Sequence, residues 1–65
     1  MTPAEFAAWR EKLGLTKVAA AKALGISVAS VALYENGKRF DDGRPVQIPK
    51  TVILATEALT YRHYA

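Results

Sequence analysis

The sequence predicts an all-α fold of four to five short helices, in a single domain covering residues 1–65. Apolar residues recur at helical spacing in segments bounded by residues that begin or end helices. Alanine is abundant, and most other apolar residues are Leu, Val and Ile, which suits short helices that approach closely. There is no cysteine, so this small core must come from helix packing, alone or with the help of a second subunit.

The first helix is expected to begin at Pro3, because Thr2 fits the N-cap position and proline fits the first helical position. Glu5 completes a capping box with Thr2, and Gly14 ends the helix. Three apolar residues at helical spacing form the stripe that we expect to be buried: Phe6, Trp9 and Leu13. Trp9 is therefore interpreted as a core residue.

Two further helices are predicted on either side of Gly25, since glycine permits the left-handed backbone of a tight turn. Thr16 caps the helix over residues 17–24, Ser27 caps the next helix, and Gly37 ends it. The residues expected to face the core are Ala20, Ala21, Leu24, Val31 and Tyr34.

The segment over residues 38–48 lacks a helical period, and Asp41-Asp42-Gly43 predicts a turn within it. Three apolar residues are expected to hold this loop against the body of the domain: Phe40, Val46 and Ile48. Pro49 is expected to open a last helix covering about residues 49–64.

The last helix carries more apolar residues than one buried stripe needs. One face, made of Val52, Ala55, Thr56 and Leu59, suits the core of the domain. A second apolar set is interpreted as a dimer interface: Ile53, Leu54, Ala58 and Tyr61. A domain this small rarely covers two faces of one helix, although a helix sunk deeply into the core is the alternative.

The spacing around Gly25 is that of a helix-turn-helix. Ala21 lies four residues before the glycine and Val31 six after it. The small residue lets the second helix approach, and the apolar residue packs against the first, leaving the opposite face open to the DNA major groove. Further residues that fit this motif are Leu15-Thr16, Leu24, Ile26-Ser27, Tyr34-Glu35 and Gly37-Lys38-Arg39.

Together these residues, from 15 to 39 without insertion or deletion, resemble the helix-turn-helix of the Cro/C1-type (XRE) repressors. The resemblance implies a lambda-repressor-like DNA-binding domain with its helix-turn-helix core at about residues 16–36. It also implies a structural ion pair between Arg10 and Glu35. A shorter likeness, in Gly43-Arg44-Pro45 and in residues 49–52 and 55–59, is to the small anti-CRISPR-associated repressors of phages.

On the third helix, the residues expected to face DNA are Ser27, Val28, Ala29, Ser30, Leu33 and Asn36. Related repressors often carry glutamine, arginine or asparagine at these positions, whereas Val28, Ala29 and Leu33 are apolar. Direct hydrogen-bonded readout of bases is therefore weakened, and contacts to thymine methyl groups are expected instead.

Basic residues surround this helix, and such residues position a protein on DNA phosphates. Lys17 begins the second helix, Lys38 and Arg39 follow the third, and Lys50 lies at the start of the last. Arg44 is our candidate for reaching a base or the minor groove; the alternative is a solvated loop in which it balances Asp41 and Asp42.

Nine Lys and Arg residues against six Asp and Glu residues give a formal charge of +3, which favours a polyanionic partner. His63 is the only histidine, so no metal site or other cofactor is expected. No catalytic motif is present, so we expect neither enzymatic activity nor a small-molecule ligand. No apolar run reaches the roughly 20 residues of a membrane span, and the start of the chain lacks a basic signal-peptide region, so a cytoplasmic location is expected.

We interpret the chain as a dimeric, sequence-specific regulator of bacterial, phage or mobile-element origin that represses transcription. It would bind a palindromic operator in double-stranded DNA, with half-sites about one helical turn apart. Autorepression of an anti-CRISPR or other phage operon is a narrower variant. The alternative is a helix-turn-helix protein-interaction module or antitoxin-like adaptor, for which the apolar strip of Val28, Ala29 and Leu33 is the best support.

Overall fold

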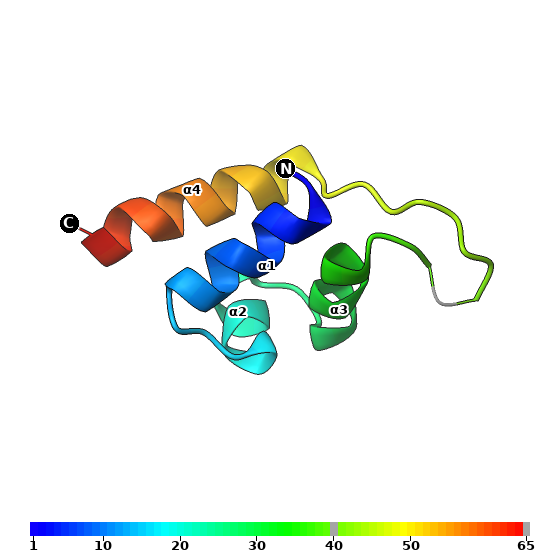
Figure 1. Ribbon diagram of the computed structural model, residues 1–65. Helices are drawn as coiled ribbons and strands as arrows, with labels where there is room; N and C mark the ends of the chain where they lie inside the picture. The colour runs from blue at the N-terminus through cyan, green and yellow to red at the C-terminus, as the bar shows by residue number, and fades with distance from the viewer. Residues whose placement is uncertain (40, 65) are drawn as a thin grey trace.

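A computed structural model of the protein describes residues 1–39 and 41–64 and contains four helices in these ranges. The helices are α1 (Pro3–Lys12), α2 (Lys17–Leu24), α3 (Val28–Asn36) and α4 (Lys50–Tyr64). Extended pairing within the described ranges is limited to one isolated antiparallel bridge between Lys38 and Pro45. The predicted all-α helix-turn-helix fold is confirmed (Figure 1).

Side-chain oxygens cap the first three helices at the predicted positions. The Glu5 backbone N–H donates to Thr2 Oγ1 at 3.1 Å, and the Thr2 N–H donates back to Glu5 Oε1 at 2.8 Å. Thr16 Oγ1 accepts from the Ala19 N–H at 3.0 Å, and Ser27 Oγ accepts from the N–H three residues later at 3.1 Å. Each cap satisfies an N–H that the helix itself leaves unpaired.

The turn between α2 and α3 depends on the left-handed backbone of Gly25, whose φ is 72°. This conformation lets the Ile26 N–H donate to Ala21 O at 3.0 Å, while the Gly25 N–H donates to Lys22 O at 3.3 Å. Both bonds satisfy carbonyl groups at the end of α2. The axes of the two helices then meet at 108°, within the range of helix-turn-helix motifs.

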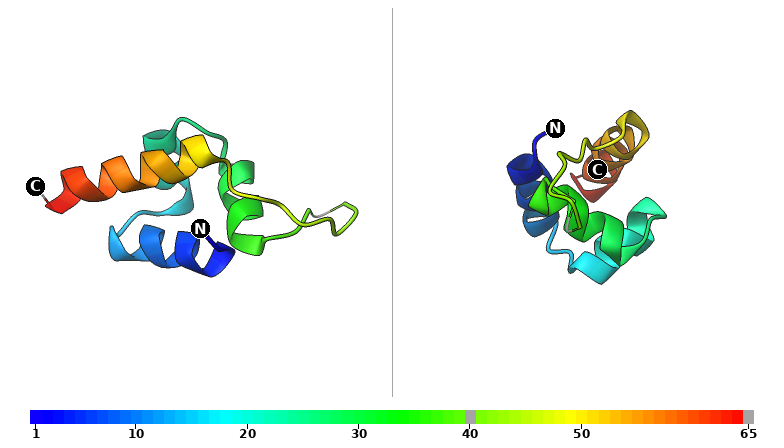
Figure 2. Two further views of the ribbon diagram at one scale, coloured as in Figure 1. Left: turned by 90° about the horizontal axis from the view of Figure 1, so that it is seen from above. Right: turned by 90° about the vertical axis from the view of Figure 1, so that its right-hand side faces the viewer.

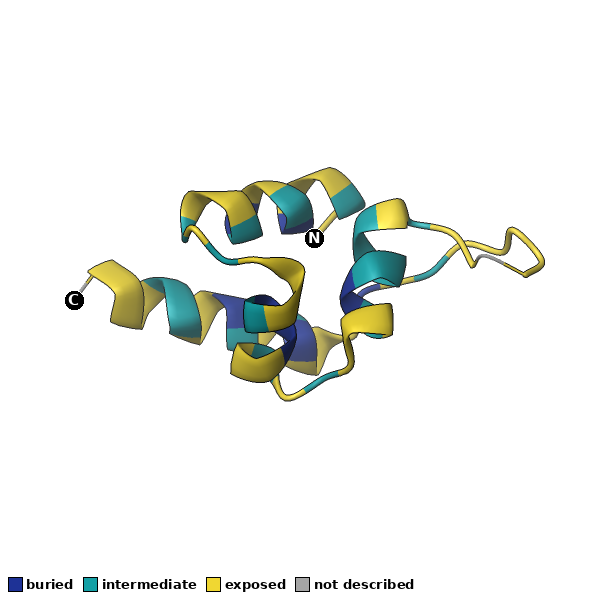
Figure 3. Ribbon diagram, turned by 90° about the horizontal axis from the view of Figure 1, so that it is seen from below, coloured by how far each residue is buried: buried dark blue, intermediate teal, exposed yellow. Residues whose placement is uncertain are grey.

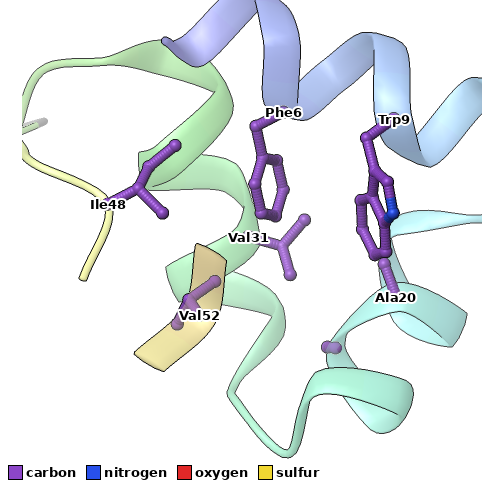
Figure 4. Packing of buried hydrophobic residues seen from close by; sticks show 7 residues of the cluster. Phe6, Trp9, Ala20, Val31, Ile48 and Val52 are labelled. Carbon is purple, nitrogen blue, oxygen red and sulfur yellow. The ribbon is translucent and has the colours of Figure 1, made fainter. Parts of the chain in front are cut away.

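The core is built around Phe6, which is completely buried and contacts aromatic rings on both sides. Its ring centroid lies 5.6 Å from that of Trp9 and 5.8 Å from that of Tyr34, which it meets edge-on. Figure 4 shows Phe6 and Trp9 extending from α1 toward α2, α3 and α4. The buried apolar residues are Phe6, Trp9, Ala20, Ala21, Val31, Ile48 and Val52; Leu13, Leu24 and Tyr34 are partly buried against them.

The last helix begins at Lys50, one residue later than expected. The carbonyl of Pro49 accepts from the N–H groups of Val52 at 3.0 Å and Ile53 at 3.1 Å. Pro49 therefore flanks the helix and supplies its first acceptor instead of occupying its first turn.

A hydrogen-bonded indole attaches α4 to α1. Trp9 Nε1 lies 3.1 Å from Thr56 O and 2.9 Å from Thr60 Oγ1, so one N–H is shared between two acceptors. Beyond Thr60 the helix projects from the body, and Tyr61 is 77% exposed (Figure 2). The indole thus marks the last point at which the core holds α4.

The loop between α3 and α4 extends in the opposite direction from the end of α4, which accounts for overall extents of 40 × 20 × 18 Å (Figure 1). Ile48 is buried and Val46 is half-buried, as expected of residues that hold the loop; Phe40 lies outside the described residues. Among the described helices no single one is long and apolar enough to cross a membrane, and only the bent α2–α3 pair meets those criteria.

Gly25 and Gly37 provide a matched test of this backbone geometry, because both have a positive φ but different surroundings. A Cβ added at Gly25 would meet nothing within 4 Å, whereas one at Gly37 would lie 2.8 Å from Pro3 Cγ. Gly25→Ala should lower the free energy of unfolding by about 1–2 kcal/mol through backbone strain alone. Gly37→Ala should lower it further in urea denaturation, since the Pro3 ring must also shift. Equal losses would show that α1 and the end of α3 are not in this close contact.

Candidate nucleic-acid interface

The beginning of α3 presents a small apolar surface. Val28 is 42% exposed, and its neighbours Ser27 and Ala29 are exposed as well. Ser30 and Leu33 are half-buried, so Leu33 is less open than its expected outward position suggested. Of the sequence-predicted DNA-facing set, Ser27, Val28 and Ala29 therefore lie together at the exposed helix start, whereas the exposed Asn36 lies at the other end of α3.

Several polar groups at this surface already bond within the chain. Ser27 Oγ accepts from the Ser30 N–H and lies 3.0 Å from Ser30 Oγ. At the other end of α3, Asn36 Nδ2 donates to Lys38 O at 2.8 Å. The face of α3 consequently combines apolar side chains with hydroxyl and amide groups that have local partners.

The orientation of α3 is held by an ion pair with α1. Arg10 Nε donates to Glu35 Oε2 at 2.8 Å and Arg10 Nη2 donates to Glu35 Oε1 at 3.0 Å, a bidentate pair between the two residues that the family resemblance pairs. The two side chains are only 16% and 11% exposed. The hydrogen bond with Glu35 raises the pKa of Arg10 above its ordinary value. A third bond, from Arg10 Nη1 to Leu15 O at 2.9 Å, joins the connection before α2 to the same guanidinium.

Exposed lysines lie on the two segments that adjoin α3 in the chain. Lys17 is the exposed first residue of α2, and the exposed Lys38 follows α3. Figures 1 and 2 show α3 lying between α2 and the loop that leads to α4. Figure 3 shows that this loop is mostly exposed. Lys50, at the start of α4, is exposed as well.

The two loop arginines are exposed and paired with aspartates. Arg39 Nε lies 3.2 Å from Asp41 Oδ1 and 3.7 Å from Asp42 Oδ1, and Arg44 Nε lies 3.3 Å from Asp42 Oδ2. The hydrogen bond from Arg39 lowers the pKa of Asp41, and the same bond raises the pKa of Arg39. The charge balance that the sequence offered as an alternative for Arg44 is thus present in the loop.

Two contacts that connect α1 to other parts of the chain were not predicted from the sequence. The bond from Trp9 to Thr60 spans 51 residues, and the bond from Arg10 to Leu15 O needs a particular chain reversal after α1. Neither has a local signature in the sequence. In the part of the chain that the structure describes, no three acidic or histidine side chains gather where they could hold a metal ion.

The comparisons with known proteins give one match. A family model described as helix-turn-helix matches residues 6–41, which run from the buried Phe6 in α1 through α2 and α3 into the following loop. Comparison with curated proteins and with solved structures gives no match.

Arg10→Ala should lower the free energy of unfolding by about 2–4 kcal/mol, because it leaves the Glu35 carboxylate without its partner in a mostly buried position. Arg62→Ala is the matched control, since Arg62 is an exposed arginine near the end of α4. Urea denaturation measures both. If the two variants unfold at the same urea concentration, the Arg10–Glu35 pair does not hold α3 in place.

Proposed function

Because the chain belongs to the helix-turn-helix family, of the Cro/C1 (XRE) type, we propose that it is a homodimeric repressor that recognises a specific DNA sequence. Membership of the family makes it a DNA-binding transcription regulator; the repressor role, the dimer and the residues in contact are the proposal. The observation that carries it is the exposed start of α3, fixed by Arg10 and Glu35 and flanked by basic residues.

In this proposal α3 enters the major groove with Ser27, Val28 and Ala29 closest to the bases. Apolar side chains contact thymine methyl groups, while Ser30, Leu33 and Asn36 lie at the margins. Lys17, Lys38 and Arg39 contact phosphates and set the register on the duplex. Arg44, with a side chain 80% exposed, reaches a base edge or the minor groove.

The proposed dimer forms through the outer face of α4. Leu54 is 53% exposed, Tyr61 is 77% exposed and Ala58 lies exposed between them, at a spacing that places all three on one helix face. Ile53 is half-buried against the core and would contribute only its outer edge. A second copy suits this face, because a two-fold axis pairs the same apolar patch with itself and presents two α3 helices to successive major grooves.

Repression would follow from occupancy, since a dimer bound across an inverted repeat at a promoter blocks polymerase. The promoter of its own operon is the simplest target. An anti-CRISPR or other phage operon is the narrower variant that the Gly43-Arg44-Pro45 likeness supports.

A protein-interaction module is the second candidate, favoured by the exposed Val28 and by the ion pairs that neutralise Arg39 and Arg44. Salt dependence separates the two. DNA binding through about six phosphates per dimer should give a slope near −5 in a plot of log K against log salt concentration. Association of apolar protein surfaces would instead depend little on salt.

Lys17→Ala and Arg39→Ala should weaken binding to operator and to random duplex together, and each should reduce the salt slope by about one if its side chain neutralises one phosphate. Arg44→Ala should weaken operator binding more than random binding, by about 1–3 kcal/mol, if it contacts a base. Lys22→Ala, an exposed lysine farther along α2, is the control. Fluorescence anisotropy over a salt series measures all four. Unchanged affinity in Lys17→Ala and Arg39→Ala would remove the proposed phosphate frame.

Leu54→Asp and Tyr61→Asp should each give folded monomers that bind the operator more weakly, since two joined half-sites act through effective concentration. His63→Asp is the control, because this exposed residue lies about two and a half turns from Leu54, on the opposite side of α4. Sedimentation velocity measures the oligomeric state, and circular dichroism verifies folding. Dimers that persist in both apolar-face variants would place the interface elsewhere.

A further inference from the structure

We propose that Asp41 and Asp42 compete with DNA for the guanidinium groups of Arg39 and Arg44, and thereby limit binding to arbitrary duplex DNA. The inference rests on the proposed function, in which these arginines contact DNA, and it assigns the two carboxylates an active part in that contact.

The geometry brings both arginines to the two carboxylates. Arg39 donates to Asp41 through Nε at 3.2 Å and through Nη2 at 3.4 Å, with an oxygen of Asp42 3.7 Å from its Nε. Arg44 Nε lies 3.3 Å from the other oxygen of Asp42. Carboxylates and phosphates use the same donors of a guanidinium in the same forked arrangement. Each pair must therefore separate, at least in part, before the arginine binds a phosphate in that way.

The turn fixes the carboxylates more firmly than the guanidinium groups. Asp41 Oδ1 accepts from the Asp42 N–H at 2.9 Å, and Asp42 Oδ1 accepts from the Arg44 N–H at 3.0 Å. The turn itself is closed by bonds from Gly43 N to Arg39 O at 3.1 Å and from Arg39 N to Arg44 O at 2.8 Å. The arginine side chains are 55% and 80% exposed and rotate on long stems. When DNA approaches, we expect the arginines to turn toward it while the carboxylates stay in the turn.

Such exposed ion pairs are weak, so they compete with phosphate without locking the loop. Between residues 38 and 44 the chain carries three basic and two acidic residues, and the field it presents to DNA is smaller than its basic residues alone would give. A phosphate must also approach the two fixed carboxylates. The smaller positive field and the repulsion between phosphate and the two carboxylates both weaken the sequence-independent part of DNA binding.

The test compares the wild-type chain with Asp41→Asn/Asp42→Asn on a random duplex over a salt series. Asparagine keeps the side-chain oxygen that accepts from the turn amides, so it removes charge and preserves the turn. Glu11→Gln/Glu57→Gln, at exposed positions of α1 and α4, makes the same change in net charge away from the loop. We expect the loop variant to bind about two- to fivefold more tightly for each carboxylate removed. Its salt slope should also steepen, whereas the control should change little.

A double-mutant cycle then shows whether the carboxylates act through the arginines. In an Arg39→Ala/Arg44→Ala background, the gain from the two asparagines should become clearly smaller, because only the part that comes from the local field and from repulsion of phosphate is left. A gain of undiminished size there, or a loop variant that binds no more tightly than the control, would overturn the inference while leaving DNA binding intact. If the wild-type chain does not bind duplex DNA, both the inference and the proposed function fail.

Discussion

The guanidinium of Arg10 joins three segments that otherwise meet through a small apolar core. It pairs bidentately with Glu35 at the end of α3 and donates to Leu15 O before α2. Since the two side chains are mostly buried, their bonds are shielded from water and set the orientation of α3 relative to α1. Glu35 also lies two residues before Gly37, whose left-handed backbone begins the loop between α3 and α4. The direction of α3 and the start of that loop therefore depend on the Arg10 side chain.

The small size of the core explains the rest of the architecture. Ala20 and Ala21 let helices approach closely around Phe6, but they supply little apolar surface of their own. Trp9 adds a large apolar ring to this core, and its indole N–H bonds to α4. The same helix leaves Leu54 and Tyr61 exposed, so a helix that completes the core also carries exposed apolar side chains. Stability and the proposed dimer are thus linked through α4.

Local chemistry made much of the fold predictable. Thr2, Thr16 and Ser27 cap their helices as expected, because capping depends on residues only three positions away. The Arg10–Glu35 pair was predictable only through the family resemblance, since its partners are 25 residues apart. The Trp9–Thr60 bond and the loop ion pairs depend on how distant segments cross or how an aperiodic turn closes. The DNA-facing residues of α3 stay a prediction, since such contacts form only in the docked complex.

We propose that DNA docks on the start of α3, between Lys17 and the loop at residues 38–44. A titration of the ¹⁵N-labelled chain with a short duplex, followed through backbone amide chemical shifts, tests it residue by residue. We expect the largest changes at the first turns of α2 and α3 and at Lys38, Arg39 and Arg44, with little change at Arg62 and His63. Changes confined to α1 and the outer face of α4, or no change with any duplex, would contradict it.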